Sequence, residues 1–351
     1  MLADLLLKAL IAMAPVMILL LVFDRLDVFN LIPMRDIALL TITGVALALF
    51  SYFANLSVMD GFPIGRTSYS RYVAPVVEET MKAAPIIFLF SRNRLGFKLD
   101  AAIAGFAVGA GFSMAENLWY LVALDQTNIT DWLVRGFGTA IMHGAATALF
   151  AVISHEFSEK QAEGAATHYE FLPALFVPGL LVAMALHSVF NHFPAQPLIA
   201  MVLTLLLAPM TLFLTLARSE RATRRWLAAD AAAHRQVLDD IRAGRFAESK
   251  TGGALRGQIG ELRGVSPEDV MAYVELKMEL VLRAEELILA THEGAGAAAN
   301  DADREKFARL DALEHRLGKT VVAAISSRVG FSRNDLYELG RLRARLVEDK
   351  N

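Results

Sequence analysis

The chain has 351 residues, 55% of them hydrophobic, and a mean hydropathy of +0.42. This apolar share exceeds that of an ordinary soluble domain, so the composition predicts a membrane protein. Cysteine is absent, which excludes disulfides, thiolate nucleophiles and cysteine-based metal sites. The net charge is only −3, but residues 218–351 hold 23 of the 34 Lys and Arg and 22 of the 37 Asp and Glu. We therefore expect a membrane-embedded domain at 1–217 and a cytoplasmic helical domain at 218–351.

Seven stretches are long and apolar enough to cross a bilayer as helices. They lie near 2–23, 37–59, 72–90, 99–122, 132–155, 171–193 and 197–217. The first is expected to remain as a span rather than to be cleaved as a signal peptide, because its apolar run is unbroken and follows no basic segment. The predicted fold class is all-α: a polytopic membrane helix bundle of about seven transmembrane helices with a C-terminal soluble helical domain.

Basic residues are unevenly distributed between the two sets of alternate loops. One set holds only Arg66 and Arg71, and the other holds Arg25, Arg35, Arg92, Arg94, Lys98 and Lys160. Cytoplasmic loops carry the excess of Lys and Arg in membrane proteins. The pattern predicts an N-terminus outside the membrane and a C-terminal domain in the cytoplasm.

The polar C-terminal part has apolar residues at helical spacing in 219–246, 267–292, 301–328 and 333–349. Ser266 before Pro267, and Ser332 three residues before Asp335, are typical of helix starts. The sequence has no Gly-rich phosphate loop and no basic, aromatic-studded face, so nucleic acid is not an expected partner. We expect these helices to contact a regulator or further copies of the chain.

Ionisable and amide side chains interrupt four of the apolar spans. A charge near the centre of a membrane helix costs about 2.5–3.5 kcal/mol, so these groups require compensation. The predicted site consists of Glu78, Glu79 and Lys82 in the third span, Glu116 and Asn117 in the fourth, His143 in the fifth, and His187 and Asn191 in the sixth. Arg135, at the outer end of the fifth span, is expected to be an anchor in the lipid headgroups.

The predicted topology places these groups in one layer. At 1.5 Å per residue, Glu78, Glu116 and His187 lie about 9 Å below the outer boundary, and His143 lies about 16 Å below it. Gly105 and Gly109 lead toward Glu116 at four-residue spacing, which lets a neighbouring helix approach closely. We therefore expect one polar pocket that opens outward.

The residue types in this layer suit hydrolysis of a carbonyl group. Two adjacent carboxylates with a lysine in a low dielectric are an arrangement that tunes a general base. Histidine and asparagine supply a proton relay and donors for the developing oxyanion. The chemistry indicated is water-mediated peptide hydrolysis inside the membrane, without a cofactor.

Three alternatives stay open at this point. A Zn²⁺-dependent protease would use Glu116, His143 and His187 as metal ligands and Glu78 as the base. A proton or ion pathway would also place acidic and histidine residues in spans, although it predicts them through the full depth. A scaffold that binds partners through its soluble helices needs no catalytic group at all.

The motifs Glu78-Glu79-Thr-Met-Lys82, Phe112-Ser-Met-Ala-Glu116-Asn117, His143 and His187-Ser-Val-Phe-Asn191 resemble those of the PrsW family of bacterial intramembrane proteases. They are more distantly similar to the type II CAAX prenyl endopeptidases. The resemblance covers roughly residues 35–217. It implies a glutamic-type protease of the bacterial inner membrane that cuts a single-span membrane protein, such as an anti-sigma factor, at its outer side.

The resemblance also implies roles for the motif residues. Glu78 would activate water with Glu79 in support, and His187 and Asn191 would stabilise the oxyanion. Two positions depart from the prenyl-endopeptidase pattern: Lys82 stands one residue earlier than that family's arginine, and Glu116 stands where it has a histidine. Glu116 would therefore replace a histidine in orienting the water.

Overall fold

The computed structural model describes residues 2–26, 32–123, 128–164, 172–193, 196–261, 266–292 and 298–348. All regular structure in these residues is helical, which confirms the predicted class. The chain divides into two compact units, one made of Met1–Glu159 and Phe171–Glu220 and the other of Lys160–Glu170 and Arg221–Asn351. Helix α9 (Pro197–Arg242) runs from the first unit into the second, so the predicted span 197–217 and helix 219–246 form one continuous element.

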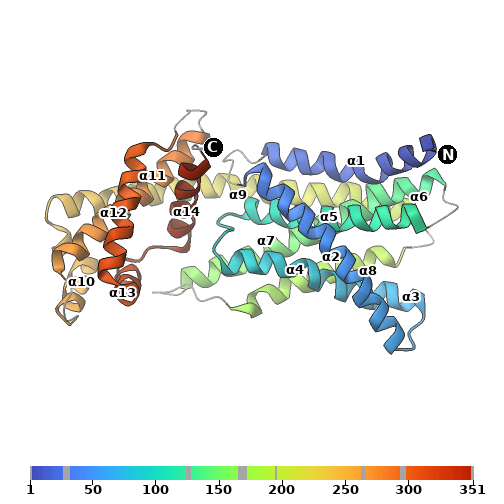
Figure 1. Ribbon diagram of the computed structural model, residues 1–351, viewed down its shortest axis with the longest axis horizontal. Helices are drawn as coiled ribbons and strands as arrows, with labels where there is room; N and C mark the ends of the chain where they lie inside the picture. The colour runs from blue at the N-terminus through green and yellow to red at the C-terminus, as the bar shows by residue number, and fades with distance from the viewer. Residues whose placement is uncertain are drawn as a thin grey trace. The chain divides into compact units, whose positions relative to one another are not determined.

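The helices that belong mainly to the first unit are drawn from blue to yellow in Figure 1. They are α1 (Leu2–Leu26), α2 (Met34–Gly61), α3 (Arg66–Ser68), η1 (Tyr69–Val73), α4 (Ala74–Ser91), α5 (Lys98–Ala123), α6 (Ile129–Val134), η2 (Arg135–Thr139), α7 (Ala140–Gly164), η3 (Pro173–Phe176), α8 (Val177–Asn191) and the first part of α9. The segments η1 and η2 are π-helical turns, and η3 is a 3₁₀ turn.

Six helical segments of the described residues are long and apolar enough to cross a membrane, so the protein is a multi-pass membrane protein. They are Ala3–Phe23, Met34–Gly61, Lys98–Ala123, Ile129–Gln161, Pro173–Asn191 and Pro197–Leu214. The predicted third span, now α4, is not among them because its 18 residues include Glu78, Glu79 and Lys82. Helix α4 nevertheless packs against α2, α5 and α8, so it belongs to the same bundle.

Helices α5 and α7 form the centre of the first unit. In each of their spans 78% of the apolar window is buried, against 17% for α1 and α2. The predicted close approach at Gly105 and Gly109 is confirmed. A Cβ atom on Gly109 would lie 2.3 Å from the carbonyl oxygen of His143, and one on Gly105 would lie 2.5 Å from that of Thr147. These glycines therefore fix how closely α7 and its histidine approach α5.

The second unit packs around α11 (Pro267–His292). Its other helices are the remainder of α9, η4 (Phe246–Glu248), α10 (Lys250–Glu261), α12 (Asp301–Leu317), α13 (Lys319–Val329) and α14 (Arg333–Glu348). The predicted helix 301–328 is broken at Gly318, whose φ of +80° ends α12. The predicted start at Ser332 is confirmed, because the Asp335 amide donates to Ser332 Oγ and the Ser332 amide donates to the Asp335 carboxylate.

Candidate active site

Contacts between the ends of helices mark the two ends of the first unit. Lys98, at the start of α5, pairs with Glu156 and Glu159 near the end of α7, at 2.5 and 3.5 Å. At the opposite end, the Asn191 amide donates to the Ser70 carbonyl oxygen at 2.8 Å. The turn η1, just before α4, and the end of α8 therefore meet there.

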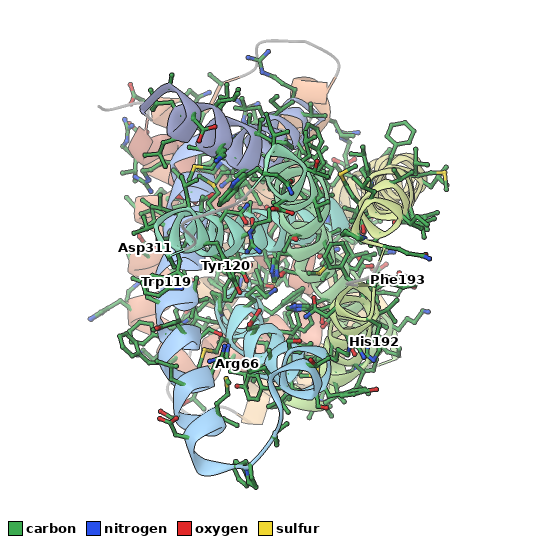
Figure 2. All side chains as sticks on the ribbon, turned by 90° about the vertical axis from the view of Figure 1, so that its right-hand side faces the viewer. Arg66, Trp119, Tyr120, His192, Phe193 and Asp311 are labelled. Atoms are coloured by element: carbon green, nitrogen blue, oxygen red, sulfur yellow. The ribbon has the colours of Figure 1, made fainter. Side chains whose placement is uncertain are left out.

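This second end faces the viewer in Figure 2, which labels Arg66 on α3, Trp119 and Tyr120 on α5, and His192 just after α8. His192 Nε2 is 3.0 Å from the hydroxyl of Tyr72 in η1, so the segment after α8 is held to the segment before α4. The candidate site lies between α4, α5, α7 and α8, farther from this end of the unit than the contacts of Asn191 and His192.

A buried network joins α4, α7 and α8. Lys82 Nζ lies 2.6 Å from Glu79 Oε1 and 2.9 Å from His143 Nδ1. The same Glu79 oxygen lies 2.7 Å from His187 Nδ1. All four side chains are at most 4% exposed. The charges that interrupt α4 are thus compensated by an ion pair and by hydrogen bonds from two neighbouring helices.

The partners fix the orientation of both imidazoles. A carboxylate only accepts hydrogen bonds and an ammonium group only donates them. Because His187 Nδ1 must donate to Glu79, a neutral His187 has its lone pair on Nε2. Because His143 Nδ1 accepts from Lys82, His143 carries its proton on Nε2, which donates to Glu116 Oε2 at 3.2 Å.

Glu78 faces the free nitrogen of His187 across a gap. Its Oε2 is 3.9 Å from His187 Nε2, while its Oε1 accepts a hydrogen bond from Asn55 Nδ2 at 3.2 Å. Asn55 is itself held by the hydroxyl of Tyr69, which donates to Asn55 Oδ1 at 2.7 Å. A carboxylate oxygen and an imidazole lone pair cannot bond to each other directly, so the gap suits a bridging water or a cation.

Glu116 forms the more open side of the cluster, with 26% of its side chain exposed. Arg135 Nη2 is 3.6 Å from Glu116 Oε1, and Arg135 Nε donates to Asn117 Oδ1 at 3.0 Å. The expectation that Arg135 is a headgroup anchor is therefore wrong, because its guanidinium turns inward. It also stacks 3.7 Å from the ring centre of Tyr120.

Two predicted site residues lie outside the cluster. Asn191 was expected to stabilise an oxyanion, but its amide is bound to the Ser70 carbonyl at the rim. Asn117 donates to the Ala12 carbonyl oxygen at 3.0 Å and accepts from Arg135, so it ties α1 to η2. Both placements have one cause: each amide donates to a backbone carbonyl on a helical segment that the motif spacing does not reveal.

The sequence reasoning missed Asn55 and Tyr69. A signal for Asn55 existed, because it is a lone amide inside the apolar run 37–59 and lies only four residues from its outer end. That depth is close to the layer of Glu78. Tyr69 gave no signal, since an aromatic residue near a membrane boundary is ordinary.

The predicted metal-ligand set of Glu116, His143 and His187 is not the set that the structure assembles. Among the described residues of the first unit, the group with ligand atoms within 4.8 Å of one another is Glu78, His143 and His187. Two histidines and a glutamate suit Zn²⁺ by type, and Glu79 orients His187 as outer carboxylates do. The fit is incomplete, because His143 has one nitrogen occupied by Lys82 and the other donating to Glu116.

Carboxylates and imidazoles enclosed between the spans of a polytopic helical protein are the groups that a membrane-embedded hydrolase uses. The family model described as PrsW family intramembrane metalloprotease matches residues 33–217, more than half of the chain. The chain belongs to this family and is an intramembrane protease. No curated protein and no solved structure matches the chain.

Proposed function

We propose that the protease is of the glutamic type, with Glu78 as the general base. The observation that carries this proposal is the 3.9 Å gap between Glu78 Oε2 and His187 Nε2. Both atoms accept hydrogen bonds, and one water that donates a hydrogen to each would fill the gap. Such a water is oriented and has its proton in contact with a base.

The reaction follows from this placement. Glu78 takes a proton from the water while the water oxygen forms a bond to the peptide carbonyl carbon. The developing oxyanion requires donors, and two N–H groups beside Glu116, those of His143 Nε2 and of Arg135, would supply them. Glu78 then delivers its proton to the leaving nitrogen as the carbon–nitrogen bond breaks, which yields an amine and a carboxylic acid.

The remaining members of the cluster act as positioning residues. Glu79 holds His187 so that Nε2 faces the gap, and Lys82 holds His143 so that Nε2 carries its proton. Asn55 fixes one oxygen of Glu78 and leaves the other for the water. Because each of these bonds is made before substrate arrives, the site is preorganised.

A Zn²⁺-dependent reaction is the second candidate, favoured by the grouping of Glu78, His143 and His187 and by the description of the family as metalloproteases. A bound zinc ion would polarise the carbonyl and lower the pKa of a water ligand. This candidate requires Lys82 to release His143 Nδ1 so that a ring nitrogen becomes free. The Zn²⁺-dependent reaction is second because the contact between Lys82 Nζ and His143 Nδ1 is 2.9 Å long, so a hydrogen bond would have to break before zinc binds.

We further propose that the substrate is a single-span protein of the bacterial inner membrane, such as an anti-sigma factor, that is cut near the outer face. The excess of basic residues in the loops at the Lys98 end supports a cytoplasmic location for that end. The cluster lies toward the opposite end, where Asn191 meets Ser70. The same orientation has α4 crossing the membrane as a seventh span, with its charges compensated inside the bundle.

The test is cleavage of a single-span substrate by purified protein in proteoliposomes, with metal content measured on the same samples. Glu78→Gln, which keeps shape and loses basicity, is expected to lower the rate at least about 100-fold. Glu156→Gln at the other end is the matched control and is expected to keep the wild-type rate. Cleavage by Glu78→Gln at the wild-type rate contradicts the proposal, and one zinc per chain whose removal abolishes activity reversibly favours the second candidate.

A further inference from the structure

Five titratable side chains from three helices meet inside the second unit, outside the candidate active site. They are Asp230 and His234 of α9, Glu285 of α11, and Asp335 and Glu338 of α14. One ligand atom from each of Asp230, His234, Glu285 and Asp335 lies within 4.8 Å of the others. Neither the family match, which ends at residue 217, nor the proposed protease reaction uses them.

His234 is oriented within this cluster by one strong contact. Its Nδ1 lies 2.7 Å from Glu285 Oε1, so that nitrogen donates to the carboxylate. Its Nε2 is 3.7 Å from Asp335 Oδ2, which is too long for a hydrogen bond. The second oxygen of Glu285 has no hydrogen-bond partner among the described residues. His234 Nε2 therefore has a carboxylate oxygen close by without a hydrogen bond to it.

Glu338 is a second, independent indication that this cluster binds a ligand. Its side chain is fully buried, and neither carboxylate oxygen has a hydrogen-bond partner in the part of the chain that the structure describes. Burial, together with the nearby carboxylates of Glu285, Asp335 and Asp230, raises the pKa of Glu338 well above its ordinary value. The three carboxylates that act on Glu338 are all members of the cluster, so its buried and unpartnered side chain lies beside the other four.

Buried carboxylates without partners are costly, and proteins relieve the cost with protons or with a cation. We propose that the four residues with converging ligand atoms, with Glu338 beside them, bind a divalent transition-metal ion that ties α9, α11 and α14 together. An imidazole with several carboxylates suits Zn²⁺, Mn²⁺ or Fe²⁺, whereas Mg²⁺ and Ca²⁺ prefer oxygen ligands alone. The side chain of His234 is 13% exposed, which gives an ion access from solvent.

The test is titration of Zn²⁺ into the full-length protein by calorimetry at pH 7. The background variant Glu78→Gln with His187→Gln removes two ligands of the candidate active site, so its result is independent of the proposed protease mechanism. In this background we expect one Zn²⁺ per chain and at least a tenfold loss of affinity on His234→Gln. His315→Gln, on an exposed position of α12, is the matched control and is expected to bind as the background does.

Glu338→Gln separates binding from folding, because it keeps the shape of the side chain and removes its carboxyl group. We expect this variant to stay folded and also to bind Zn²⁺ at least tenfold more weakly. Zn²⁺ should raise the thermal unfolding temperature of the background protein but not that of its His234→Gln derivative. A background protein that binds no Zn²⁺, or variants that bind as tightly as the background, would overturn the proposal.

Discussion

Lys82 is the residue on which the candidate site depends most, because it contacts both a carboxylate and an imidazole in full burial. We expect Lys82→Met to abolish cleavage and to destabilise the protein by about 3–5 kcal/mol, since Glu79 would remain buried without its cation. Adding Glu79→Gln to that variant should restore most of the stability, measured by thermal unfolding, but not the activity. Restored cleavage in the double variant would contradict the positioning role of Lys82.

Lys277 is a buried lysine of α11 in the second unit, only 4% exposed, and it donates to the Tyr273 hydroxyl at 2.7 Å. Burial lowers its pKa below the ordinary 10.5. The folded protein therefore binds fewer protons than the unfolded chain as pH approaches 10.5, so this residue's contribution to stability rises with pH.

The lowered pKa of Lys277 predicts the effect of one substitution on stability. Lys277→Met should be more stable than the wild type at pH 7, and its advantage should shrink as the pH rises from 7 toward 10.5. Thermal unfolding across this range measures the difference, with Lys319→Met as an exposed control. An advantage that grows with pH would contradict the assignment.

At the residue scale, the sequence revealed the groups whose burial costs the most free energy. Glu78, Glu79, Lys82 and the two histidines interrupt apolar helices, so each had to find a partner, and depth along the helices placed them in one layer. The hydrogen-bond partners of Asn117 and Asn191 could not be predicted, because an amide is satisfied by any nearby backbone carbonyl.

At the scale of elements, the contact between α5 and α7 sets the position of His143. Gly109→Ala would push a Cβ atom against the His143 carbonyl oxygen, now 2.3 Å from that position. We expect a loss of about 1–3 kcal/mol in stability and a strong loss of cleavage. Gly61→Ala is the matched control, since nothing lies within 4 Å of its added atom. Unchanged cleavage in Gly109→Ala would show that His143 tolerates displacement.

Helix starts and the close approach at Gly105 and Gly109 were predictable because they depend on local sequence, as the Ser332–Asp335 cap shows. The break at Gly318 was missed because apolar spacing continues on both sides of it. The continuity of α9 was missed for the opposite reason: its composition changes near residue 217 while its backbone geometry does not. Composition therefore indicates whether a helix is surrounded by lipid or by water, and it does not show where the helix ends.

At the scale of the whole molecule, every residue of the candidate active site lies in the first unit, and the family match also ends within it. We expect a chain that ends at Glu220 to remain folded in membranes and to cleave its substrate within about tenfold of the wild-type rate. Proteoliposome cleavage measures this, with Glu78→Gln in the truncated chain as the blank. A folded but inactive truncated chain would show that the second unit takes part in catalysis.

The π-helical turn η2 governs how Arg135 and His143 share one partner. Both contact Glu116, yet they are eight residues apart on consecutive helical segments. In an unbroken α-helix, eight steps of about 100° leave two side chains roughly 80° out of phase. A π turn absorbs about one residue, which reduces the offset to roughly 20° in the other direction. The widened turn therefore brings Arg135 and His143 to the same side of the helix, so that both face Glu116. In a regular helix the two side chains would face different neighbours.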